Sequence, residues 1–172
     1  TVVERVGDDD WDRPTPCTEW DARALVEHVI GFHEFLLLRP LGVRAHRPRT
    51  GSSARWRATE SALREVLSNP AALRDAVEHF DGSRRRPIAV LDAVAADTLV
   101  HTWDLARAVG APDRLHPVLC ERAFSDAVGS SAMRAASALY AAPVPVAADA
   151  DVQDRLLGLL GRDPGWRRTR RA

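Results

Sequence analysis

The chain has 172 residues, of which 45% are hydrophobic and 28% are charged, a size and composition typical of one globular domain with its own core. Its 24 basic residues, all of them Arg, balance 24 acidic residues, so no net charge attracts nucleic acid or an anionic membrane. The use of Arg alone indicates a high-GC coding bias and a bacterial source. No apolar run approaches the roughly 20 residues of a membrane span, and the first residues lack the pattern of a signal peptide. Because the spacing of the two cysteines matches no redox or zinc-finger motif, we expect a cytoplasmic protein.

The first predicted helix follows a connector, DDDWDRPTPCTEW, in which prolines and turn formers block regular structure. Thr18 can cap a helix over about residues 19–38. His28 lies on the apolar stripe of this helix, whose members recur at steps of three and four residues. We therefore expect His28 to face the core.

Polar and proline-rich residues 39–53 predict a surface loop. Helical periodicity resumes near Ala54 and ends before Asn69. Pro70 then favours the start of a short helix through about Phe80.

The longest predicted helix covers residues 87–109, and its apolar stripe carries two ionisable residues, Asp97 and His101. A further helix is expected over about residues 116–139, and a last short one in DVQDRLLGLLG. No strand pattern of convincing length and no internal repeat occurs. The sequence therefore predicts an all-α helical bundle in a single domain, 1–172.

Asp97 and His101 are four residues apart, so both side chains leave the same face of their helix. A buried carboxylate needs a partner, a proton or a cation, and one divalent metal ion would satisfy Asp97, His101 and His28 together. Two imidazoles and one carboxylate suit zinc, nickel or ferrous iron, and they leave a coordination position open. The alternative is a metal-free polar pair of Asp97 with His101, with His28 as a satisfied core residue.

Other residues near these motifs are weaker candidates. Cys17 precedes the helix of His28 and could serve as a soft ligand or redox thiol, although a small buried apolar role is favoured. Asp104 is within reach of His101, but an exposed pair with Arg107 is equally plausible. Surface roles are expected for the remaining histidines, which are His33, His46, His79 and His116.

Three segments together resemble a known family. They are DWDRPTPCTEWDARALVEHVIG, ADTLVHTWDLARAVG and LLGLLGRDPGW. In this combination they resemble the DinB-like metal-binding proteins, in the branch related to the N-terminal metal-binding domain of mycothiol-dependent maleylpyruvate isomerase. The resemblance implies a DinB-like four-helix bundle with additional short helices, and a divalent metal, usually zinc, bound by His28, Asp97 and His101. The isomerase branch usually carries Glu at the position of Asp97, whose side chain reaches about one methylene less far.

The resemblance also implies a function. We expect a divalent-metal-binding protein that acts as a mycothiol-dependent transferase or isomerase on a small electrophilic substrate. The alternative is a non-catalytic metal- or ligand-binding module. No residue is assigned as a general acid or base. The expected partners are a small-molecule thiol or an electrophile, with a homodimer as a further expectation and with neither nucleic acid nor membrane.

Overall fold

The computed structural model describes residues 1–46, 48, 51–130 and 141–168, and the chain divides into two compact units. The first unit contains Arg23–Thr98 together with Thr1 and Val3, and the second contains Glu4–Ala22, Leu99–Ala172 and Val2. Within the described residues the secondary structure is helical apart from one isolated bridge and one short hairpin, so the predicted all-α class is confirmed. No helix in this described part is long and apolar enough to cross a membrane.

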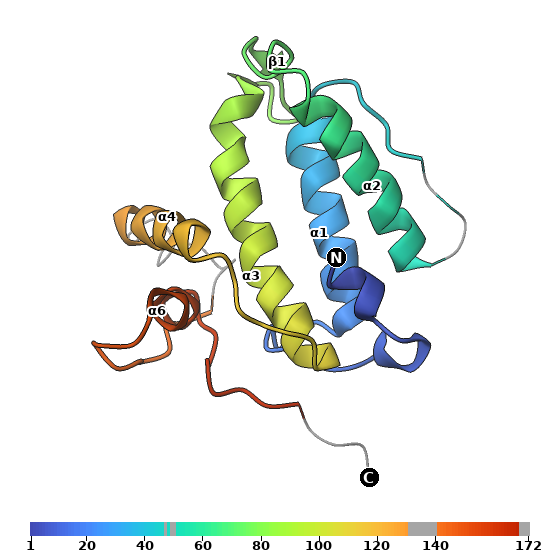
Figure 1. Cartoon of the computed structure of the whole chain (residues 1–172). Coiled ribbons are helices and arrows are strands. Elements are labelled where there is room, and N and C mark those ends of the chain that lie inside the picture. Colours follow the sequence, from blue (N-terminus) through green and yellow to red (C-terminus); the bar gives the residue numbers. More distant parts are fainter. Residues whose placement is uncertain (47, 49–50, 131–140, 169–172) are drawn as a thin grey trace. The chain divides into compact units, whose positions relative to one another are not determined.

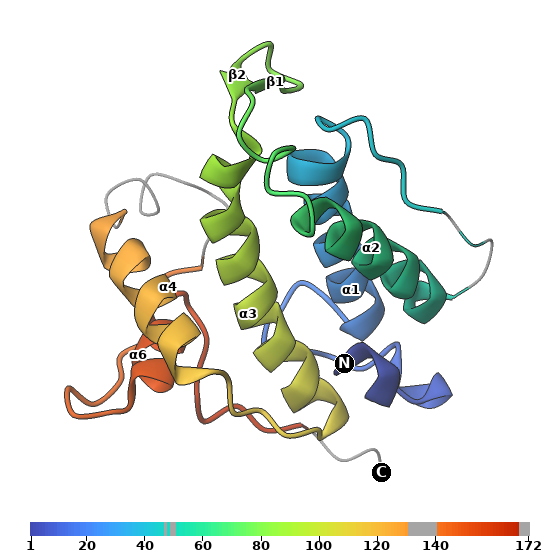
Figure 2. The same ribbon diagram turned by 45° about the horizontal axis from the view of Figure 1, so that its top comes forward.

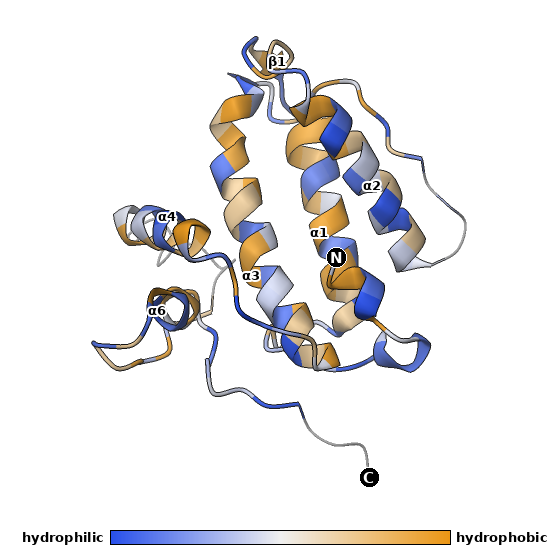
Figure 3. Ribbon diagram, viewed as in Figure 1, coloured by the Kyte–Doolittle hydropathy of each residue, from blue (hydrophilic) through white to orange (hydrophobic). Residues whose placement is uncertain are grey.

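The first unit contains α1 (Ala22–His33), which continues into a π-type turn at Glu34–Leu38, and α2 (Ser52–Leu67). These two helices lie side by side in both ribbon views (Figures 1 and 2). The predicted helix over 19–38 begins a turn later than expected, because the residues before Ala22 form a closed loop. Hydrophobic and hydrophilic residues alternate along both helices (Figure 3), as expected of helices with one buried face.

A compact apolar core lies where the π-type turn meets α2 and a 3-10 turn at Pro87–Val90. The 3-10 turn leads directly into α3 (Leu91–Val109), so the helix predicted over 87–109 is confirmed. The boundary between the two units falls within α3, between Thr98 and Leu99. The buried members of the core are Leu37, Leu38, Leu63, Val66, Leu73 and Val90.

The short helix predicted over 70–80 is wrong. Turns follow Pro70, and a hairpin then pairs β1 (Val77–Glu78) with β2 (Arg84–Arg85), as Figure 2 shows. Gly82 adopts a φ of 73°, and the Asp81 carboxylate accepts hydrogen bonds from the backbone and hydroxyl of Ser83. Asp81 and Gly82 therefore form a hairpin turn and do not end a helix.

The second unit contains α4 (Pro117–Gly129) and α6 (Val152–Leu159), which pack against each other (Figure 1). Asp151 caps α6, because its carboxylate accepts a hydrogen bond from the backbone N–H of Asp154 at 3.0 Å. The start of the helix predicted over 116–139 and the last short helix are confirmed. Residues 131–139 of that prediction lie outside the described residues.

Candidate metal centre

Cys17 lies in a closed loop before α1. The loop is joined by an antiparallel bridge between Pro14 and Asp21. Inside it, the buried hydroxyl of Thr15 donates to the carbonyl of Trp20 at 2.8 Å and accepts from the backbone N–H of Cys17 at 3.1 Å. These bonds explain how a segment rich in turn formers holds one conformation and presents a half-buried thiol.

His101 and Asp104 face each other on α3. Nδ1 of His101 lies 3.0 Å from Oδ2 of Asp104, and Nη2 of Arg162 lies 3.1 Å from the same oxygen. A carboxylate paired with a guanidinium accepts hydrogen bonds, so the neutral imidazole carries its proton on Nδ1 and keeps its lone pair on Nε2. Carboxylates commonly orient metal-binding histidines in this way.

The second oxygen of Asp104 has no hydrogen-bond partner among the described residues, although the side chain is fully buried. Leaving such an acceptor unsatisfied costs on the order of 1–3 kcal/mol. The ring of Trp20 covers His101, with centroids 5.5 Å apart. The surroundings of His101 therefore combine a buried carboxylate with an aromatic wall.

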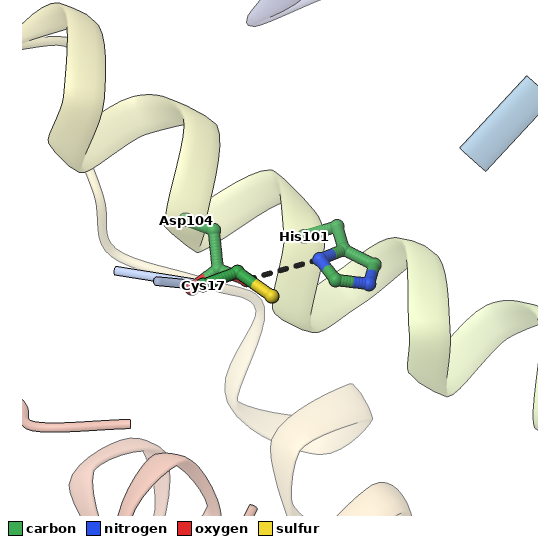
Figure 4. Close-up of side chains that lie close together, drawn as sticks. All are labelled: Cys17, His101 and Asp104. Atoms are coloured by element: carbon green, nitrogen blue, oxygen red, sulfur yellow. Dashed lines mark hydrogen bonds and ion pairs between the residues drawn. The ribbon is translucent and has the colours of Figure 1, made fainter. Parts of the chain in front are cut away.

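Cys17 joins this cluster from its loop, and Figure 4 shows its sulfur beside the imidazole of His101. Each of Cys17, His101 and Asp104 offers one ligand atom, and these three atoms lie within 4.8 Å of one another. All three residues belong to the second unit. A thiol, an imidazole and a carboxylate at this separation could hold a metal ion.

His28 and Asp97 meet in the first unit. Nε2 of His28 lies 3.3 Å from Oδ1 of Asp97, and the two side chains are 30% and 19% exposed. The ring of Phe32 stacks on His28 with centroids 5.7 Å apart. The structure therefore brings together two of the three predicted ligands, from α1 and from α3.

His101 lies one turn after Asp97 on α3, as predicted, and belongs to the second unit. The structure pairs His28 with Asp97 and His101 with Asp104. The complete set of His28, Asp97 and His101 as ligands of one ion stays a prediction.

The exposed pair of Asp104 with Arg107 is wrong. Arg107 contacts Asp113 at 2.6 Å and donates to the carbonyl of Pro164 at 3.1 Å. Asp104 turns to His101 and Arg162 because its side chain is on the buried face of α3. Arg162 was not singled out from the sequence, since no spacing relates it to α3.

The surface roles expected for His33 and His79 are also wrong, because both are buried. Within α1, Nδ1 of His33 donates a hydrogen bond to the carbonyl of Val29 at 2.7 Å. The ring is enclosed by α3, where Nε2 contacts the Thr98 hydroxyl at 3.2 Å, and by α2, where it meets Trp56 edge-on. Burial lowers the pKa of His33, so the neutral form is favoured. His46 and His116 are exposed, as predicted.

The fold is helical, and imidazole, carboxylate and thiol groups lie close together on or near α3. These features place the chain in the class of candidate metal-binding proteins. The chain belongs to the family described as the mycothiol maleylpyruvate isomerase N-terminal domain, whose model matches residues 1–106. The resemblance is thereby confirmed over residues 1–106, which contain the first motif and most of the second.

The chain is also similar to two uncharacterized proteins of Mycobacterium tuberculosis, MT0763 from strain CDC 1551 / Oshkosh and Rv0738 from strain ATCC 25618 / H37Rv. Each is 30% identical over 154 residues, covering 87% of this chain and 83% of the relative. No solved structure matches the chain.

Proposed function

We propose that this protein binds one divalent metal ion through His28, Asp97 and Nε2 of His101, with zinc as the first candidate and nickel or ferrous iron as others. The observation that carries the proposal is the 3.3 Å approach of His28 to Asp97, one helical turn before His101. Two imidazoles and one carboxylate form a ligand set that zinc accepts while keeping a position open.

Asp104 supports this assignment from the other side of the imidazole. By accepting the Nδ1 proton at 3.0 Å it fixes the tautomer whose Nε2 lone pair can bind a metal. Arg162 contacts the same Asp104 oxygen as His101, so in this site Asp104 orients His101 through Oδ2 and is not itself a ligand. Asp104 is thus a positioning residue for His101.

We further propose that the protein is a thiol-dependent transferase or isomerase that acts on a small electrophile, with mycothiol as the thiol. Membership in the family described as the mycothiol maleylpyruvate isomerase N-terminal domain supports this activity. A bound divalent ion supplies the Lewis acidity that favours the thiolate form of a low-molecular-weight thiol at neutral pH. The ring of Trp20 lies against the imidazole of His101, with ring centroids 5.5 Å apart.

The test is a calorimetric titration of zinc-loaded protein with mycothiol and, in parallel, with mycothiol whose sulfur is methylated. We expect binding of the free thiol and at least tenfold weaker binding of the blocked one, since the metal recognises the sulfur. His116→Ala serves as the matched control, because it removes an exposed histidine that is not a proposed ligand. This variant should bind mycothiol like the wild type. Metal-loaded protein that binds neither mycothiol nor another low-molecular-weight thiol would overturn the proposed activity.

A further inference from the structure

We propose that Cys17, His101 and Asp104 form an alternative site for a soft, thiophilic metal ion, and that His101 serves either this site or the one with His28 and Asp97. The sharing of His101 rests on the proposed function, whereas the thiol site itself does not. Its ligand atoms lie within 4.8 Å of one another inside a single unit of the fold (Figure 4).

The position of Cys17 is built into the loop. The bridge between Pro14 and Asp21 closes the loop, and the Thr15 hydroxyl holds the backbone N–H of Cys17 at 3.1 Å. A thiol on such a braced segment needs little reordering to bind a metal. Trp20, from the same loop, rests on the ring of His101 and keeps the loop against α3.

A second observation points to a cation. Oδ1 of Asp104 is buried and has no hydrogen-bond partner among the described residues. The other oxygen of Asp104 contacts His101 and Arg162. An ion between Cys17 and His101 would give Oδ1 of Asp104 the partner that the described residues do not provide.

The two sites exclude each other because a neutral imidazole has one lone pair. Binding with His28 and Asp97 uses Nε2 while Asp104 holds the Nδ1 proton. Binding with Cys17 and Asp104 uses Nδ1, so the ring proton shifts to Nε2 through solvent and the thiol releases its proton to solvent. No electron is transferred in either mode.

The choice between the sites follows the softness of the ion. A thiolate favours cadmium, a soft ion, whereas imidazoles and a carboxylate without sulfur suit nickel. Cadmium and nickel therefore serve as probes that should report different ligand sets in the same protein.

The experiment measures cadmium and nickel binding by calorimetry, together with the near-ultraviolet absorption of a cadmium–thiolate bond, in Cys17→Ser and Asp97→Asn. We expect Cys17→Ser to abolish the cadmium–thiolate band and weaken cadmium binding roughly tenfold or more, with nickel affinity unchanged. Asp97→Asn should weaken nickel binding by a similar factor and leave the band intact. Cys120→Ser, at the other cysteine, is the matched control. It should keep both the cadmium–thiolate band and the nickel affinity of the wild type.

Two further measurements keep the inference falsifiable if Cys17→Ser fails to fold. Cadmium should protect Cys17 of the wild type from alkylation by iodoacetamide, and cadmium and nickel together should total one ion per chain. Retention of the cadmium band in folded Cys17→Ser, alkylation of Cys17 despite bound cadmium, or one ion of each kind per chain would overturn the inference. Unchanged nickel binding in Asp97→Asn would instead contradict the proposed function, and the cadmium result would stand.

Discussion

Nδ1 of His101 donates a hydrogen bond to Oδ2 of Asp104 over 3.0 Å, between side chains three residues apart on α3. This contact leaves Nε2 of His101 as the ring nitrogen available to a metal in the site with His28 and Asp97. It also connects the proposed centre to Arg162, whose guanidinium lies 3.1 Å from the same carboxylate oxygen. A buried network within the second unit thus orients His101, a proposed metal ligand.

Replacing Asp104 by Asn should weaken zinc binding about 10- to 100-fold, the usual effect of losing a carboxylate that orients a histidine ligand. Competition with a chromophoric chelator measures this affinity. Asp126→Asn, at an exposed carboxylate on α4, is the matched control and should bind zinc like the wild type. Wild-type affinity in folded Asp104→Asn would show that Asp104 does not position His101.

Removing the metal should lower the thermal stability of the protein. An ion that binds only the folded chain adds about 2.7 kcal/mol when its free concentration is 100 times its dissociation constant. Differential scanning calorimetry of zinc-loaded protein, with and without chelator, checks this loss. The melting temperature of His101→Ala should not respond to chelator, and an equally insensitive wild type would argue against the centre.

His33 should make stability depend on pH. Its pKa in the folded chain lies below the ordinary value of 6.5, chiefly because burial disfavours the charged imidazole. As pH falls through 6.5 the unfolded chain takes up a proton that the folded chain refuses, so the free energy of unfolding decreases and levels off below the folded pKa. The stabilising contribution is complete above 6.5.

Urea unfolding at pH 7.5 and pH 5.5 tests this linkage. His33→Gln should lose less unfolding free energy than the wild type over that interval, because the variant has no imidazole at this site to protonate. An equal loss in both proteins would mean that His33 is not the group responsible.

Gly158 is required where α6 approaches the chain before it. A Cβ at this position would lie 2.7 Å from the carbonyl oxygen of Val144 and 2.9 Å from a methyl carbon of Val146. The backbone N–H of Val144 also donates to the carbonyl of Gly158 at 2.8 Å, so the segments cannot easily separate. Gly158→Ala should therefore destabilise the protein by about 1–3 kcal/mol.

Thermal denaturation measures this change, with Gly129→Ala as its control. A Cβ at Gly129 meets nothing within 4 Å among the described residues, so that variant should be neutral or slightly more stable. Equal melting temperatures for Gly158→Ala and Gly129→Ala would contradict the close approach at α6.

Much of the helical framework could be predicted because its apolar stripes have the period of a helix. The stripe that contains Asp97 and His101 predicted α3. The stripe through His28 predicted that this residue faces inward, and the structure brings it to Asp97. Where local chemistry supports two outcomes, prediction failed. Asp81 and Gly82 can end a helix or turn a hairpin, and the pairing of Val77 with Arg85 selects the hairpin.

Tertiary contacts decided the remaining errors. His33 was assigned to the surface because it points away from His28, yet Trp56 and Thr98 enclose it from two other helices. Arg162 is 58 residues from Asp104, and no periodic pattern relates them. Such contacts depend on how elements pack, which helical periodicity alone does not specify.

The most direct test of the central claim is elemental analysis of the purified protein, compared with His101→Ala prepared in the same way. His101 contributes to the proposed site and to its alternative, so its loss should remove the metal from both. We predict one divalent ion per chain in the wild type and less than a tenth of that in folded His101→Ala, as expected when a ligand is lost. A wild type without stoichiometric metal, or a His101→Ala variant that retains it, would contradict the account.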